Sequence, residues 1–368
     1  MKMSSLYKKL FGIYIHWPYC RSKCPYCDFF SLPCKSPDEE EILEGYLKEF
    51  DKYKTRKKVT SIFIGGGTPS MMSYAVLEKL FLTIRKNFIL ASDIEITLEA
   101  NPNALDIAKM KFLKKLGVNR LSIGVQSLSD NDLKFLGRTH SVQEALVCIE
   151  NAKRIFDNVN IDLIYARPNQ TQQAWEEELK EALSLRLQHY SLYQLMIEEG
   201  TPFFKRQVQV PEEQQAINLY KLTEELTRKN KIYRYEVSNY AQQGFQCIHN
   251  LTYWLYHPYI GIGPSAQGRW KGCAIQNPRD IRLWSKGYQE SEKLSEYEAL
   301  IESILMNIRL KDVGIKLSVL DKKGVQKAID YEWGYIKKGR FYSSFNGVLV
   351  LDQLLFTIIP QKKDFHKN

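Results

Sequence analysis

The 368-residue chain lacks a long apolar run. Its best candidate, GVLVLDQLLFTII (347–359), is short and is interrupted by Asp352 and Gln353. A membrane-spanning helix needs about 18 or more consecutive apolar residues. Internal repeats at solenoid or propeller periods and low-complexity segments are also missing. These absences predict a soluble protein and argue against a repeat architecture.

Cysteine is scarce, and its seven copies are an odd number. The hydrophobic content of 44% is enough for a sizeable core, so the chain does not need disulfide bonds as a small secreted domain would. Three of the cysteines are crowded together, as metal ligands usually are. We therefore expect a cytoplasmic protein.

The formal net charge of +10 shows that acidic residues are outnumbered. Such a charge concentrates nucleic acids, anionic membrane surfaces or anionic small molecules near a protein. The lysines and arginines are spread along the chain, and no RNA-binding appendage is recognisable. We expect no nucleic-acid partner, and modification of tRNA is the least favoured function.

Alternating strand and helix patterns fill the first half of the chain. Runs of β-branched and aromatic residues predict strands at 12–17, 59–65, 93–100, 120–127, 159–165 and 189–195. Helical spacing lies between them, at 38–57, 74–88, 105–116, 142–156 and 171–185. This alternation predicts an α/β fold in which right-handed crossovers join parallel strands. Six such units fit a partial (β/α)6 TIM-like barrel, whose chemistry gathers at the carboxyl ends of the strands.

The alternation ends near residue 205, and Pro211 begins a different pattern. We expect a barrel core at 1–205, an accessory segment at 206–295, and a smaller C-terminal region at 296–368. The last region is predicted to be helical and winged-helix-like, with an α+β character.

The segment HWPYCRSKCPYCDFF (16–30) places Cys20, Cys24 and Cys27 in one loop after the first predicted strand. A structural zinc site usually takes two ligands from each of two separated pairs, and the chain offers no second Cys-x2-Cys pair. A [4Fe–4S] cluster held by three cysteines leaves one iron open for another ligand. The cluster is the favoured interpretation, with zinc or an inert buried trio as the alternatives.

The Cys-x3-Cys-x2-Cys spacing, with Tyr26 before the third cysteine, resembles the signature of radical S-adenosylmethionine (SAM) proteins. In that superfamily the methionine part of SAM ligates the open iron. SAM carries a sulfonium, an amine and a carboxylate, which suit carboxylate, amide and guanidinium partners. The resemblance implies a SAM site formed by Tyr14, Tyr26, Gly66, Gly67, Thr68, Glu99, Gln126, Arg138 and Asp162. The segment DLIYARPNQT departs from the family form, because Ala166 and Arg167 stand where Gly-Leu usually precedes the proline.

The resemblance narrows to the branch that contains oxygen-independent coproporphyrinogen III oxidase and the HemW family of haem chaperones. The oxidase carries a further cysteine two residues after the third cluster cysteine, whereas this chain has Phe29. The segment HNLTYW resembles the His-Asn-x2-Tyr-Trp motif of the chaperones. Imidazole is a common haem ligand, and aromatic rings can stack on the macrocycle. The implied haem-binding residues are His249, Asn250, Tyr253 and Trp254.

The resemblance thus implies a haem chaperone that carries a [4Fe–4S] cluster and SAM. It would take haem as cargo and deliver it to acceptor haem proteins such as membrane-bound respiratory enzymes. We assign no catalytic residue, and coproporphyrinogen III oxidase activity is the alternative function. A homodimer is implied as a possible assembly, and the basic surface would favour peripheral contact with the inner face of an anionic membrane.

Overall fold

Six parallel strands form the centre of the fold in the computed structural model, which describes residues 9–362. They are β1 (Gly12–Trp17), β4 (Val59–Gly66), β5 (Leu90–Ala100), β6 (Arg120–Gln126), β7 (Asn158–Tyr165) and β8 (His189–Gln194). Each pairs in parallel with the next strand of this series. Most of their residues are buried, as expected for parallel strands covered on both faces. The predicted α/β class with a barrel-like series of β/α units is confirmed.

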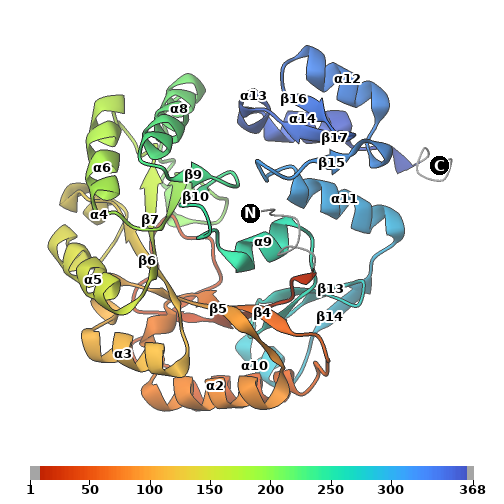
Figure 1. Cartoon of the computed structure of the whole chain (residues 1–368). Helices are drawn as coiled ribbons and strands as arrows, with labels where there is room; N and C mark the ends of the chain where they lie inside the picture. The colour runs from red at the N-terminus through yellow and green to blue at the C-terminus, as the bar shows by residue number, and fades with distance from the viewer. Residues whose placement is uncertain (1–8, 363–368) are drawn as a thin grey trace.

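Helices connect these strands and cover the outside of the sheet (Figure 1). They are α1 (Glu39–Phe50), α2 (Tyr74–Asn87), α3 (Ile107–Leu116), α4 (Asp130–Phe135), α5 (Val142–Ile155) and α6 (Gln172–Ser184). Side-chain oxygens accept hydrogen bonds from backbone N–H groups at the start of each helix, as at Ser73, Ser141 and Thr171. Such caps satisfy backbone donors that have no partner inside the helix.

The central sheet extends beyond the six strands at both edges. On one side β11 (Tyr259–Ile262) pairs in parallel with β1, and three antiparallel strands follow it: β12 (Gln267–Trp270), β13 (Cys273–Gln276) and β14 (Glu290–Lys293). On the other side β10 (Asn239–Ala241) and β9 (Tyr233–Arg234) follow β8. Part of the predicted accessory segment therefore belongs to the main sheet. The boundaries at 205 and 295 stay predictions.

Shorter elements complete the segment between β8 and the C-terminal region. They are α7 (Pro202–Lys205), α8 (Glu213–Lys229), α9 (Ile248–Trp254) and α10 (Ile281–Ser285), and the cysteine loop itself contains β2 (Tyr19–Cys20) and β3 (Leu32–Pro33). Helix α9 contacts β4 and so lies against the barrel.

The C-terminal region has a hydrophobic core of its own, which includes Ile304, Phe341 and Leu354. Its elements are α11 (Glu296–Asn307), β15 (Ile315–Lys316), α12 (Lys322–Asp330), β16 (Gly334–Lys337), β17 (Arg340–Ser343), α13 (Phe345–Leu349) and α14 (Leu351–Ile358). This region lies at the upper right in Figure 1. Residues 1–8 and 363–368, which the predicted first and third regions include, lie outside the described residues. Within residues 9–362 no helix is long and apolar enough to cross a membrane.

A buried carboxylate on α1 ties the barrel to the segment that follows β11. Glu49 accepts hydrogen bonds from Gly263 N (2.8 Å), Asn277 Nδ2 (2.7 Å), Trp284 Nε1 (2.7 Å) and Gln289 Nε2 (3.2 Å). All four partners are donors, so an acceptor-only side chain suits the position.

We expect Glu49→Gln to lower the free energy of unfolding by about 2 kcal/mol. The NH2 group of the new amide would face buried N–H donors that a carboxylate oxygen of Glu49 accepts from. Urea denaturation of the purified protein measures this. Glu44→Gln on the exposed face of the same helix is the matched control and should change stability by less than about 0.5 kcal/mol. Equal effects of the two variants would contradict the anchoring role of Glu49.

Candidate functional site

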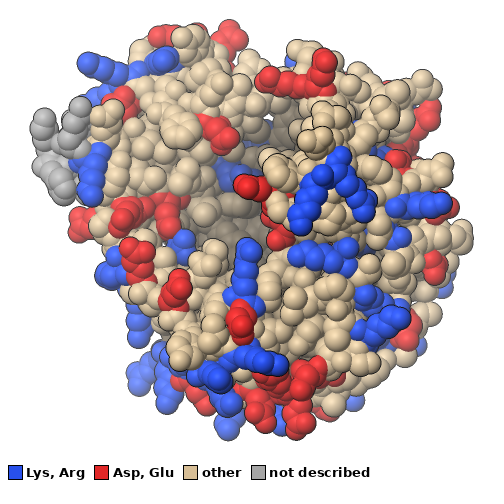
Figure 2. Space-filling model, turned by 180° about the vertical axis from the view of Figure 1, so that it is seen from behind, with Lys and Arg blue, Asp and Glu red and all other residues tan. Residues whose placement is uncertain are grey.

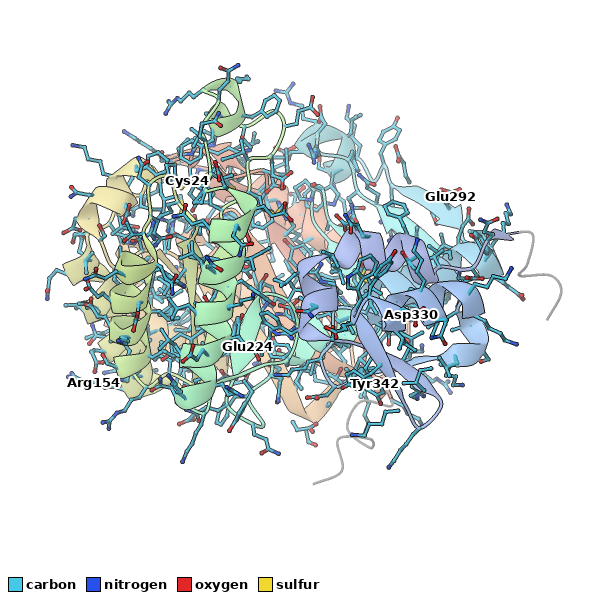
Figure 3. The ribbon with its side chains drawn as sticks, turned by 90° about the horizontal axis from the view of Figure 1, so that it is seen from above. Cys24, Arg154, Glu224, Glu292, Asp330 and Tyr342 are labelled. Carbon is cyan, nitrogen blue, oxygen red and sulfur yellow. The ribbon has the colours of Figure 1, made fainter. Side chains whose placement is uncertain are left out.

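The three clustered cysteines lie in the loop that follows β1, at the carboxyl ends of the parallel strands. Cys20 and Cys24 are buried and Cys27 is half-buried, and all three are free thiols. Figure 3 shows Cys24 at the end of the barrel opposite Arg154, which lies near the end of α5. The thiols thus occupy the end of the sheet at which α/β barrels bind their ligands.

Arg138 links this loop to β5 and β6. Its Nη1 donates to the Cys24 Sγ (3.5 Å), and its Nη2 donates to Asn101 Oδ1 (2.6 Å) and to the Gly124 carbonyl oxygen (2.8 Å). The guanidinium therefore places a positive charge against a thiol that would ligate iron as a thiolate.

Burial raises the pKa of the Cys20 thiol, while a hydrogen bond with Ser31 and the charges of Lys23 and Arg138 oppose the increase. Burial also raises the pKa of the Cys27 thiol. In residues 9–362 no three His, Cys, Asp or Glu side chains converge as ligands of a single metal ion do. Thiolates of a [4Fe–4S] cluster each bind a different iron, so they surround a cube and do not converge on one point.

A cavity of about 310 Å³ adjoins the cysteine loop, and we call it the cluster cavity. Its walls are Tyr26, Cys27, Asp28, Phe29, Phe63, Glu99, Arg120, Ser122, Gln126, Asp162, Ile164, Ser191, Tyr193, Gln194, Leu195, Met196, Glu198 and Asn250. These residues come from the cysteine loop, from strands β4 to β8, from the segment after β8 and, for Asn250, from α9. Figure 2 shows a hollow near the centre of the rear face, with acidic and basic groups around it.

Two half-buried carboxyl groups, Glu99 and Asp162, line the cluster cavity. Burial raises the pKa of Glu99 to about 8, with a further increase from the charge of Asp162 and an opposing hydrogen bond from the Gly66 N–H (3.1 Å). Burial also raises the pKa of Asp162, although Asn160 Nδ2 donates to its Oδ1 (2.8 Å). A cationic ligand would lower both values by favouring the carboxylates.

The glycine segment at the end of β4 packs against the start of the cysteine loop. Gly66 has φ of +108°, which glycine adopts without strain. A side chain on Gly67 would collide with the backbone of Tyr19. The N–H groups of Gly67 and Thr68 donate to the carbonyl oxygens of Trp17 and Tyr19, both at 2.7 Å. The close approach therefore holds the cysteine loop in place.

A second cavity, of about 410 Å³, shares Phe29 with the cluster cavity, and we call it the aromatic cavity. Its rings come from β1 (Tyr14 and His16), from the cysteine loop (Phe29 and Phe30) and from the segment 253–259. Its polar and sulfur-containing walls are Asp28, Ser265, Gln267, Arg269, Arg279 and Met306. Asp28 and Phe29 line both cavities.

Comparisons with known proteins identify the family to which the chain belongs. Residues 14–182 match the model of the radical SAM superfamily. The heme chaperone HemW of Bacillus subtilis (strain 168) is 35% identical over 318 residues, which cover 82% of this chain and 84% of that protein. The chain belongs to the HemW family of radical SAM proteins.

Two further similarities extend over nearly the whole chain. Radical S-adenosyl methionine domain-containing protein 1, mitochondrial, of Danio rerio is 32% identical over 391 residues, covering 96% of this chain and 88% of that protein. The structure of coproporphyrinogen III oxidase (HemN) from Escherichia coli has a TM-score of 0.81 and 16% identity, with 95% and 90% of the two chains covered. At this identity the last comparison supports the shared fold alone.

The SAM residues implied for a HemW-family protein fall into three groups in the structure. Tyr26, Glu99, Gln126 and Asp162 line the cluster cavity. Gln126 does so with φ of +71°, a strained conformation at the end of β6. Gly67, Thr68 and Arg138 donate hydrogen bonds to residues 17–24, which contain the start of the cysteine loop. Gly66 N–H donates to Glu99. Tyr14 lines the aromatic cavity.

Arg167, which departs from the family form, does not line the cluster cavity. Its guanidinium forms ion pairs with Glu178 (2.5 Å) and Asp132 (3.1 Å) and donates to the Ile164 carbonyl oxygen (2.8 Å). Arg167 therefore stabilises the turn after β7 and does not fill the cavity.

The four residues of the HemW-family haem motif do not line a single cavity. Tyr253 and Trp254 line the aromatic cavity, and Asn250 lines the cluster cavity. His249 lines neither of these two cavities and is only 1% exposed. Burial lowers its pKa to about 3, so the imidazole is neutral.

Several wall residues were not predicted. Arg120, Ser122, Ser191 and Tyr193 lie on β6 and β8, where the alternation of side chains along a predicted strand could have indicated them. Met196 and Glu198 follow β8 and carry no comparable signal.

Proposed function

We propose that this protein is a haem chaperone, which binds haem and delivers it to acceptor haem proteins. The observation that carries the proposal is the 35% identity, over most of both chains, to a protein named heme chaperone HemW. Phe29 supports it against the oxidase alternative, because that enzyme is expected to carry a cysteine at this position.

The residues around the cluster cavity suit a [4Fe–4S] cluster and SAM. Cys20, Cys24 and Cys27 would hold the cluster, which when bound supplies one iron free to take the amino and carboxylate groups of SAM. Glu99 and Asp162 would face the positive groups of SAM, and Arg138 keeps Cys24 in position. Tyr26 and Gln126 would contact SAM from the wall of the same cavity, and Gly66, Gly67 and Thr68 would support the site from the end of β4. Tyr14 would contribute from the aromatic cavity.

The aromatic cavity supports haem as the cargo. Its volume of about 410 Å³ lies within the range of about 300–1,000 Å³ that is usual for cofactor sites. Aromatic walls suit the faces of a porphyrin, and Arg269 and Arg279 suit its propionates. The motif residues Tyr253 and Trp254 form part of this wall.

The positive charge of the chain is consistent with haem acceptors that lie at an anionic membrane. The net charge of +10 favours approach to an anionic bilayer, so we propose membrane-bound respiratory enzymes as recipients, with the chaperone in the cytoplasm and peripherally bound. A homodimer is the proposed assembly. Sedimentation of the protein with anionic and neutral vesicles tests the membrane part.

Haem titration followed by transfer tests the function. Visible spectroscopy should show saturation at about one haem per chain, and the loaded protein should transfer haem to the apo form of a b-type cytochrome faster than free haem enters it. The reconstituted protein should form no protoporphyrinogen from coproporphyrinogen III, SAM and a reductant. Absence of stoichiometric haem binding, or formation of that product, would overturn the proposal.

A further inference from the structure

Asp162, which lines the cluster cavity, accepts a hydrogen bond from the side-chain amide of Asn160. Asn160 Nδ2 donates to Asp162 Oδ1 (2.8 Å) and to Ser122 Oγ (2.7 Å). Burial raises the pKa of Asp162, and the hydrogen bond from Asn160 opposes that increase. The NH2 group of Asn160 therefore favours the charged form of Asp162, which is the form that suits a cationic ligand.

The orientation of the Asn160 amide depends on what faces its oxygen, because the NH2 group and the oxygen can exchange places by a rotation of 180°. His189 Nδ1 lies 2.6 Å from Asn160 Oδ1, and Ser191 Oγ donates to the same oxygen (3.2 Å). Asn160 and His189 are paired in register on β7 and β8, and both are fully buried. The rotated amide would turn its oxygen toward the carboxylate of Asp162 and its NH2 group toward the imidazole.

The position of the proton on His189 follows from its partners. A carboxylate only accepts, so the NH2 group of Asn160 faces Asp162 and its oxygen faces the imidazole, which places the proton of the ring on Nδ1. The other nitrogen, Nε2, then accepts from the Tyr235 hydroxyl (2.9 Å). Burial holds the pKa of His189 well below its ordinary value, so the ring is neutral.

A hydrogen-bond chain thus extends beyond His189. The oxygen of the Tyr235 hydroxyl accepts from Asn250 Nδ2 (3.3 Å), and the His189 and Tyr235 rings are in edge contact, with centroids 5.6 Å apart. All four hydrogen bonds of this chain donate in the direction of Asp162. Hydrogen bonds aligned in this way strengthen one another.

We infer that His189 is a positioning residue of the SAM site: its Nδ1–H holds the Asn160 amide in the orientation that presents Asp162 to SAM as a carboxylate. This inference rests on the proposed function, in which Asp162 faces the positive groups of SAM. His189 lines neither the cluster cavity nor the aromatic cavity, so it acts through Asn160 and not by contact with a ligand.

Two substitutions of His189 distinguish the two ring nitrogens. The amide nitrogen of an asparagine can take the place of Nδ1, and that of a longer glutamine can take the place of Nε2. His189→Asn should keep the hydrogen bond to Asn160 and bind SAM within about twofold of the wild-type affinity. His189→Gln should lose that hydrogen bond and weaken SAM binding at least about fivefold. Equilibrium dialysis of cluster-loaded protein with SAM, without a reductant, measures both affinities.

Nitrogen-15 NMR of histidine-labelled, cluster-free protein measures the tautomer and needs no SAM. The His189 signals, assigned by their absence from His189→Asn, should show a neutral ring with its proton on Nδ1 at pH 7. A proton on Nε2, or an imidazolium ring, would overturn the inference. This measurement on the wild-type protein decides the assignment even where a variant does not fold.

Circular dichroism and thermal melting establish that each variant is folded, and iron analysis establishes that each holds the cluster. Equal SAM affinities of folded His189→Asn and His189→Gln, or a larger loss in His189→Asn, would overturn the positioning role and leave the haem chaperone function standing. Failure of the wild-type protein to bind SAM would overturn the SAM site on which the inference rests. Failure of the wild-type protein to bind haem would instead overturn the proposed function.

Discussion

Cys24→Ala is expected to purify without its iron–sulfur cluster. The wild-type protein, reconstituted without oxygen, should hold about four irons and four sulfides per chain, and the variant close to none. Cys24 is buried and accepts the hydrogen bond of Arg138, so its loss removes one iron ligand and leaves the half-buried guanidinium without that partner. Iron and sulfide analysis, together with the visible absorption of the iron–sulfur cluster, measures the effect.

Cys34→Ala provides the matched control for this experiment. Cys34 follows the same loop, and its backbone N–H donates to the Cys20 carbonyl oxygen (2.8 Å), but its side chain is outside the cysteine triplet. Its replacement should leave the iron content at the wild-type level. Equal iron loss in both variants, or none in Cys24→Ala, would show that the triplet does not hold the cluster.

Glu99→Gln is expected to stabilise the cluster-free protein while it weakens SAM binding. The folded protein keeps a proton on Glu99 up to about pH 8, whereas the unfolded chain loses it near pH 4.5. The contribution of Glu99 to the free energy of unfolding is therefore fully present below pH 4.5. It decreases by about 1.4 kcal/mol per pH unit as the pH rises to about 8. Glutamine has no such titration, so its advantage should grow with pH and reach on the order of 4 kcal/mol at pH 8.

Chemical denaturation at pH 5, 6.5 and 8 measures this trend, with the exposed Glu78→Gln on α2 as control. In cluster-loaded protein, Glu99→Gln should weaken SAM binding at least about tenfold at pH 8 and by less at pH 6, where the wild-type carboxyl group is mostly protonated. The comparison with the variant at each pH cancels the titration of SAM itself. A stability difference independent of pH would contradict the raised pKa of Glu99.

The fold was predictable because local patterns determine most of it. The predicted strand at 12–17 coincides with β1, and the predicted helix at 142–156 differs from α5 only at its last residue. The first helix was predicted to reach residue 57 but ends at Phe50, because the basic residues that follow leave no apolar stripe to pack. Strand β5 begins at Leu90, before the predicted 93, where pairing with β4 extends the ladder.

The site was predictable only where chemistry and spacing coincide in a short segment. The triplet of cysteines meets that condition. The packing of His249 does not, because its partner Ser61 is 188 positions away and only the tertiary fold brings them together. The aromatic cavity likewise gathers rings from β1, the cysteine loop and the segment 253–259, which no sequence window contains.

Phe29 gives the two cavities a common movable wall. Its side chain is 63% exposed and lines both spaces, so few packing contacts fix its rotamer. A rotation of this ring would change the walls of both cavities, so a molecule seated in either would change the free energy of filling its neighbour. Such coupling is reciprocal by thermodynamic necessity. A single phenyl ring could in this way make the occupancy of each cavity sensitive to that of the other.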